Sequence, residues 1–114
     1  MRHRFALLAL LLPLAACGGG DTLVLYSPHG RDLLELFEER YEAENLGVDV
    51  QWLDMGSQEV YDRVRSEKAN PQADVWFGGP STIFARGADE GLLEAYRPAW
   101  ADAVDPESVG AGEL

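Results

Sequence analysis

Three short segments carry the residues of this chain that are best suited to binding chemistry. Each follows an apolar run and combines glycine with small polar residues: Ser27-Pro28-His29-Gly30, Met55-Gly56-Ser57 and Gly78-Gly79-Pro80-Ser81. Each also leads into a stretch with helical spacing, so free backbone N–H groups and the positive end of a helix dipole would lie there. Such groups suit phosphate, phosphonate or carboxylate. The alternative is that these residues only cap helices and form turns.

The candidate ligand-binding residues come from these three segments. They are Ser27, His29, Ser57, Gly78, Gly79 and Ser81. The histidine has three open interpretations, which are a contact to a bound solute, a metal ligand or an ordinary loop residue. The sequence has no cysteine pair and no His-x-x-x-His spacing, so we predict no metal site and no cofactor.

Catalytic patterns are missing from the sequence. Ser27 has no base paired with it by spacing, and neither Gly-x-Ser-x-Gly nor a Walker-type phosphate loop occurs. Gly78-Gly79 lacks the spacing of a dinucleotide-binding fingerprint. The glutamates between residues 35 and 44 are expected to form a solvated helix face. We therefore do not expect an enzyme.

Alternating strands and helices are expected to position the three segments. Apolar runs at 22–26, 48–53 and 73–77 predict strands, and periodic stretches predict helices at 31–45, from an N-cap at Ser57 to Asn70, and from Pro80 as first helical residue to Gly91. Residues 92–94 are expected to be extended. This order predicts an α/β fold with a parallel sheet, in which the strand ends share one edge.

The aromatic residues of the strands are expected to be mainly structural. Trp52 and Trp76 are predicted to pack in the core. Tyr26 and Phe77 lie closest to the strand ends and could line the crevice, although core packing is the favoured interpretation for both.

An export signal is expected at the start of the chain. Residues 1–16 combine a basic start with an apolar run that is shorter than the roughly 20 residues needed to span a bilayer, which is typical of a cleaved signal peptide. Leu14-Ala15-Ala16-Cys17 resembles a bacterial lipobox, so Cys17 is the expected lipidation site, with residues 17–21 as a glycine tether. The alternative is an accidental cysteine after a plain secretory signal.

Charge and size constrain the partners and the extent of the fold. The net charge of −11 argues against a nucleic-acid partner. Three parallel strands are few for a sheet covered on both faces. We therefore expect a truncated piece of a longer protein; the family resemblance described next implies that residues 22–104 are a partial N-terminal α/β lobe and 105–114 the start of a crossover region. A complete small domain is the alternative.

The sequence resembles extracellular solute-binding proteins of ABC transporters, in the branch with ferric-iron, sugar-phosphate and phosphonate binders. The matching stretches are Leu23-Val24-Leu25-Tyr26-Ser27, Ala73-Asp74-Val75-Trp76-Phe77-Gly78-Gly79 and Glu90-Gly91-Leu92-Leu93-Glu94-Ala95-Tyr96. The resemblance implies the incomplete N-terminal lobe of a type 2 periplasmic binding protein, with a parallel three-layer sheet. It also implies a second lobe, a small-molecule or anion ligand in the cleft, and ABC permease and ATPase partners.

The same resemblance bears on the solute and the location. Ferric-binding relatives use a histidine after the first strand, which His29 matches, and a glutamate after the third, where this chain has Gly79. An oxyanion-bearing organic solute is therefore favoured, with ferric iron as the alternative. Signal and lipobox together imply an exported protein, anchored by lipid at the periplasmic or extracellular face.

Overall fold

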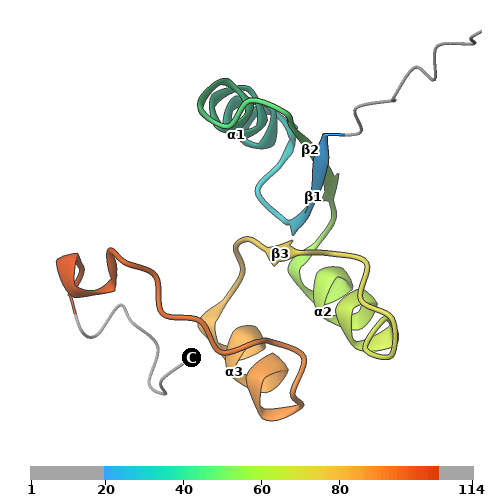
Figure 1. Ribbon diagram of the computed structural model, residues 1–114. Coiled ribbons are helices and arrows are strands. Elements are labelled where there is room, and N and C mark those ends of the chain that lie inside the picture. Colours follow the sequence, from blue (N-terminus) through green and yellow to red (C-terminus); the bar gives the residue numbers. More distant parts are fainter. Residues whose placement is uncertain (1–19, 106–114) are drawn as a thin grey trace, which may run out of the picture.

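The computed structural model describes residues 20–105, which form a parallel sheet between two helical layers (Figure 1). The predicted signal peptide, Cys17, the first part of the tether and residues 106–114 lie outside the described residues. The elements run in the order β1 (Asp21–Ser27), α1 (Arg31–Glu44), β2 (Val48–Asp54), α2 (Ser57–Ser66), β3 (Val75–Trp76), α3 (Ser81–Asp89) and a short 3₁₀ helix, η1 (Ala101–Ala103).

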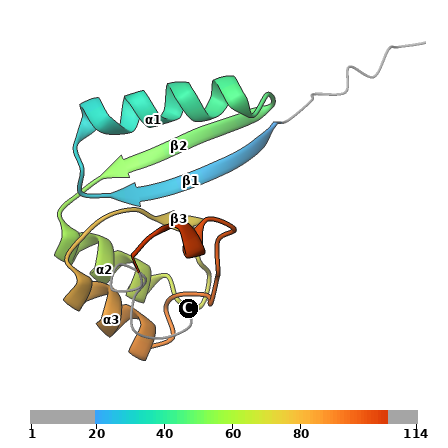
Figure 2. The ribbon, with the colours of Figure 1, turned by 90° about the vertical axis from the view of Figure 1, so that its left-hand side faces the viewer.

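The sheet has the strand order β2-β1-β3, and both pairings are parallel. The chain therefore crosses from one strand to the next through a helix, as the alternation of apolar runs and helical periods requires. Helix α1 covers one face of the sheet, and α2 and α3 lie together on the other (Figure 2). The predicted three-layer α/β fold is confirmed.

Side chains alternate between the two faces of the sheet because successive residues of a strand point in opposite directions. Trp52 lies on the α1 face, where its indole N–H donates a hydrogen bond to Glu38 at 2.6 Å. Tyr26 lies on the other face and is 1% exposed. Tyr26 is therefore a core residue, as favoured by the sequence, whereas Trp52 is only half-buried.

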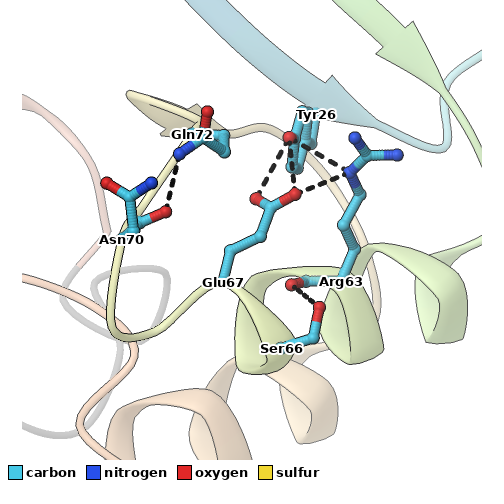
Figure 3. A network of polar contacts seen from close by, with 6 residues as sticks. All are labelled: Tyr26, Arg63, Ser66, Glu67, Asn70 and Gln72. Atoms are coloured by element: carbon cyan, nitrogen blue, oxygen red, sulfur yellow. Dashed lines mark hydrogen bonds and ion pairs between the residues drawn. The ribbon is translucent and has the colours of Figure 1, made fainter.

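A polar network attaches Tyr26 to the end of α2 (Figure 3). The Tyr26 hydroxyl lies 3.1 and 3.2 Å from the two carboxylate oxygens of Glu67 and accepts a hydrogen bond from Arg63 Nε at 3.1 Å. Arg63 and Glu67 also form an ion pair at 3.0 Å. A buried phenol needs a partner for its hydroxyl, and here the partners come from the helix that covers the central strand.

One backbone amide on the outer edge of β2 is paired with a side chain from the neighbouring helix. The backbone N–H of Val50 donates a hydrogen bond to a carboxylate oxygen of Glu42 at 2.8 Å. An edge strand normally leaves such N–H groups unpaired. At this position α1 supplies the acceptor.

Several boundaries differ from the sequence prediction. Strand β3 has two residues instead of five, because the Asp74 carboxylate accepts the N–H of Val24 at 2.8 Å and takes a place that the backbone ladder would fill. Gly56, not Ser57, precedes α2, and Pro80 lies outside α3 in an extended conformation. Residues 92–94, expected to be extended, belong to neither a helix nor a strand.

An apolar groove lies between α1 and the sheet. We call it the α1 groove; its volume is about 370 Å3, and its apolar walls include Leu23, Leu25, Phe37, Val50, Val75 and Phe77. Phe37 and Val75 remain 40% and 38% exposed.

Among residues 20–105, no helix is both long enough and apolar enough to cross a membrane.

Candidate functional site

The carboxyl ends of the three strands lie level with one another at one edge of the sheet. The register pairs Ser27 of β1 with Asp54 of β2, and Tyr26 of β1 with Trp76 of β3. Residues 27–30, 54–57 and 77–81 therefore follow the strands side by side. We call these three segments together the strand-end rim.

Direct contacts join the three segments of the rim. The Met55 N–H donates a hydrogen bond to the Ser27 carbonyl at 3.0 Å, which ties the first segment to the second. A Cβ atom built on Gly78 would lie 2.0 Å from His29 Nε2, so the imidazole rests against the glycine backbone. A Cβ built on Gly79 would lie 3.7 Å from Ser57 Oγ. The structure thus brings together the three segments that the sequence singled out.

The three helices that begin at the rim have no side-chain caps. Gly30, Gly56 and Pro80 occupy the cap positions of α1, α2 and α3, and no side chain hydrogen-bonds to any of these helix starts. Serine, threonine, asparagine or aspartate usually fills this position and accepts one of the first N–H bonds. Without such an acceptor, the first N–H groups of these helices stay available to another partner. The exception is the Ile83 N–H of α3, which donates to the Pro80 carbonyl at 3.0 Å.

Ser27 and His29 have different environments within the first segment. Ser27 is fully buried, and its hydroxyl oxygen accepts a hydrogen bond from the His29 N–H at 3.2 Å. The Ser27 side chain therefore helps to fix the backbone conformation of the loop. The His29 side chain is exposed at the rim and packs against Phe77, with 4.9 Å between ring centroids.

Phe77 in turn contacts Phe37 of α1, with 5.3 Å between ring centroids in an edge-to-face arrangement. The exposed His29 ring thus packs on Phe77, and Phe77 packs on a second aromatic ring from the neighbouring helix. Phe77 is half-buried, so it lies both at the rim and against the α1 groove.

Two glycines with positive φ form the third segment. Gly78 has φ 91° and Gly79 has φ 138°, conformations that residues with a Cβ rarely adopt. The Trp76 indole N–H donates a hydrogen bond to the Gly78 carbonyl at 3.0 Å. The sequence identifies the glycine pair but not this hydrogen bond, because it predicts Trp76 to be a core residue. The only signal in the sequence is an aromatic residue close before the glycines.

Ser57 and Ser81 are the first residues of α2 and α3. Both hydroxyls are therefore carried on first helical turns at the rim, with Ser57 partly exposed and Ser81 exposed. The prediction that Ser57 caps α2 is wrong, because the extended backbone of Gly56 already ends the loop one residue earlier.

Acidic side chains distinguish the three helix starts. The first turn of α1 contains Asp32 and the first turn of α2 contains Glu59, whereas the first turn of α3 contains no acidic residue. A carboxylate near a helix N-terminus already interacts with the helix dipole and repels another anion. The start of α3 is therefore the most favourable of the three for an anionic group.

Two described residues with shifted pKa values, Tyr61 and Arg63, lie on the α2–α3 side of the sheet. A hydrogen bond to Glu90, together with burial, raises the pKa of the Tyr61 phenol above its usual value. The hydrogen bond to Tyr26 raises the pKa of the Arg63 guanidinium. Within residues 20–105 there is no group of three or more His, Cys, Asp or Glu side chains placed to hold a metal ion.

Comparison with known proteins gives matches in sequence and in structure. The chain is 38% identical over 97 residues to a probable ABC transporter periplasmic-binding protein, y4fP, of Sinorhizobium fredii. The matched region covers 85% of this chain and 26% of that protein. The chain spans about a quarter of the length of the curated relatives that it matches. No family model matches it.

Two solved periplasmic binding proteins show the same fold. AfuA from Actinobacillus pleuropneumoniae, solved with exogenous fructose-6-phosphate bound, has a TM-score of 0.71 and 32% identity over 76% of this chain and 27% of its own. Iron-bound HitA from Pseudomonas aeruginosa has a TM-score of 0.74 and 25% identity over 82% of this chain and 30% of its own. In sequence and in fold, this chain is similar to part of a lobe of the periplasmic solute-binding proteins of ABC transporters, and the resemblance stated from its three matching stretches is confirmed.

Proposed function

We propose that this chain is part of the substrate-binding lipoprotein of an ABC import system and captures a small solute that carries an oxyanion. The observation that carries this proposal is the convergence of three helix N-termini without side-chain caps at one edge of the sheet. Backbone N–H groups arranged in this way bind phosphate, phosphonate or carboxylate through charge-assisted hydrogen bonds.

The oxyanion would bind closest to the start of α3. This helix has no acidic residue in its first turn, and the exposed Gly79 precedes it. The donors at this position would be the N–H groups of Gly78 and Gly79 and the Ser81 hydroxyl. Ser57 Oγ approaches Gly79 from α2 and would donate from the neighbouring helix.

The first segment would complete this side of the site. His29 is exposed beside Gly78, where its imidazole would contact the solute. Ser27 would act indirectly, because its buried hydroxyl holds the His29 backbone. The resemblance to two-lobed binding proteins implies that a second lobe closes over the rim, so these residues would form one wall of an interlobe cleft.

The solved relatives support two kinds of solute. AfuA was solved with a sugar phosphate, which agrees with an oxyanion site, and HitA was solved with iron. Gly79 lies where the resemblance implies a metal-binding glutamate, and the described residues offer no cluster of three ligating side chains. We therefore favour the oxyanion over ferric iron as the solute.

Titration calorimetry on the protein produced from its complete reading frame tests the proposal. The compounds are fructose 6-phosphate, methylphosphonate, acetate and ferric citrate, with sodium citrate as the control for the chelator. At least one of the oxyanion compounds, sodium citrate included, is expected to bind. Binding of ferric ion alone would establish the alternative, and no binding of any oxyanion compound would overturn the proposal.

Matched serine variants test the location of the site. Ser81→Ala is expected to weaken binding about ten-fold, because a hydrogen bond to a charged group contributes about 1.5 kcal/mol or more. Ser66→Ala is the control: Ser66 lies at the far end of α2 and its hydroxyl donates to the Arg63 carbonyl at 2.8 Å. Equal affinities of the two variants would place the solute elsewhere.

The lipid anchor and the partners complete the proposal. Export to the periplasmic or extracellular face, attachment through lipidated Cys17, and delivery to a permease and an ATPase all follow from the resemblance and the lipobox. Labelling of cells with a palmitate analogue is expected to mark the wild-type protein and not Cys17→Ala. Equal labelling, or recovery of the wild-type protein in the soluble fraction, would contradict the anchor.

A further inference from the structure

We infer that Trp76 is a positioning residue for the solute site: its indole holds the Gly78 carbonyl and thereby directs the Gly79 N–H toward the bound solute. The inference rests on the proposed function of the strand-end rim. It assigns to a half-buried aromatic residue a role in binding that needs no contact between the indole and the solute.

The geometry of the peptide bond provides the first step. The Trp76 indole N–H donates to the Gly78 carbonyl oxygen at 3.0 Å. Because a trans peptide is planar, its N–H points away from its C=O, so the N–H of Gly79 is directed away from Trp76 and the underlying α3. The hydrogen bond therefore sets the orientation of one donor at the rim.

The need for such a hydrogen bond follows from the two glycines. Gly78 and Gly79 both have positive φ, and glycine passes readily between positive and negative φ. A peptide between two glycines would rotate with little resistance if nothing held it. A donor that must be ordered at the moment of binding costs affinity, whereas a donor that is already oriented does not.

Trp76 is itself held in place by α3. Its ring packs against Phe84, with 4.6 Å between centroids and 37° between planes. Gly87 of α3 is buried beneath it, and a Cβ at that position would lie only 3.4 Å from Trp76 Cζ3. The close approach of the helix backbone fixes the indole, and the indole in turn fixes the peptide.

His29 limits the same peptide from the other loop. A Cβ on Gly78 would lie 2.0 Å from His29 Nε2, so the imidazole occupies the space beside the Gly78 Cα. The Gly78–Gly79 peptide is thus held by a hydrogen bond from Trp76 and by contact with an exposed ring. Of these two, only the hydrogen bond determines which way the carbonyl points.

The test compares two tryptophan variants of the protein from the complete reading frame. Trp76→Phe keeps an aromatic ring against Phe84 and removes the donor to Gly78. Trp52→Phe is the matched control, because it removes an indole N–H that donates to Glu38 on the opposite face of the sheet. Binding of fructose 6-phosphate and inorganic phosphate is measured by calorimetry, and the Gly79 amide is followed by NMR relaxation.

In the unliganded protein, the Gly79 order parameter is expected to be about 0.85 in wild type and Trp52→Phe, and below about 0.6 in Trp76→Phe. Probe affinity is expected to fall about ten-fold in Trp76→Phe alone. A general loss of stability would not produce a local change confined to the Gly78–Gly79 peptide, so the order parameter separates positioning from a purely structural role.

The two measurements also separate this inference from the proposed function. A Gly79 order parameter in Trp76→Phe equal to that of wild type would overturn the inference, whatever the probe binds. Unchanged affinity of Trp76→Phe for a probe that wild type binds would also overturn it. If wild type binds neither probe, phosphate compounds are excluded as the solute and the oxyanion proposal is decided by the other compounds named above, while the order parameter still shows whether Trp76 orients the peptide.

Discussion

Gly78→Ala would place a Cβ atom where the His29 imidazole now lies. The new atom would be 2.0 Å from Nε2 and 2.4 Å from Cδ2, far closer than van der Waals contact allows. The side chain of His29 is exposed, so the ring is expected to move outward rather than the backbone. Its contact with Phe77, at 4.9 Å between centroids, would then be lost.

The cost of this change has two parts. A residue with a Cβ at φ 91° costs about 1–2 kcal/mol relative to glycine. Loss of the His29–Phe77 ring contact costs about 0.5–1.5 kcal/mol, at the lower end because the imidazole is exposed. We therefore expect Gly78→Ala to lower the free energy of unfolding by about 2 kcal/mol.

Gly56→Ala is the control for this variant. Gly56 has φ −58°, and no atom lies within 4 Å of the position that its Cβ would take. The control should change the free energy of unfolding by less than about 0.5 kcal/mol, or raise it slightly because alanine restricts the unfolded chain. Urea unfolding of the protein from the complete reading frame measures both variants.

A double-mutant cycle separates the two parts of the cost. In a His29→Ala background, Gly78→Ala should cost only the backbone part, about 1–2 kcal/mol. A cost that does not depend on the imidazole would refute the steric contact. A cost equal to that of Gly56→Ala would refute both the contact and the backbone strain at this glycine.

Three further predictions concern stability. Tyr26→Phe should lower the free energy of unfolding by about 1 kcal/mol in urea, because it removes the hydroxyl that joins β1 to the ion pair of Figure 3; an unchanged midpoint would contradict this. The Tyr61 phenol stays protonated in the folded state above the usual pKa of about 10, so its contribution is complete below pH 10 and lost as pH rises through the folded pKa. Urea midpoints above pH 10 should therefore fall more steeply in wild type than in Tyr61→Phe, and parallel curves would argue against it. The described part of the chain, produced alone, should bind an apolar dye through the α1 groove and melt below about 50 °C, and a cooperative melt above that temperature without dye binding would oppose this.

The beginning of the fold could be predicted closely from the sequence. The first strand and helix end within one residue of their expected bounds, because Pro28 and Gly30 interrupt the apolar pattern and Gly47 supplies a left-handed turn with φ 91°. The shared edge of the strand ends also followed from the alternation of strands and helices. These features depend on local chemistry, which short stretches of sequence contain.

Other features depend on contacts between distant residues. The short β3 results from an Asp74 carboxylate that bonds to the backbone of β1, fifty residues earlier in the chain. The role of Trp76 could not be found, since an indole before two glycines gives the same pattern whether it packs or donates. The contact between His29 and Gly78 required the strand order, with β1 between the other two, which the sequence left open.

The hydrogen bond between Val50 and Glu42 makes the β2 edge of the sheet different from the β3 edge as a place where another strand could pair. Glu42 already satisfies the Val50 amide there, so a foreign strand arriving at that margin would first have to displace a carboxylate. The opposite edge of the sheet is formed by β3. At the level of Val50, therefore, an additional strand, whether from the same polypeptide or from a misfolded neighbour, would meet an amide that is already paired.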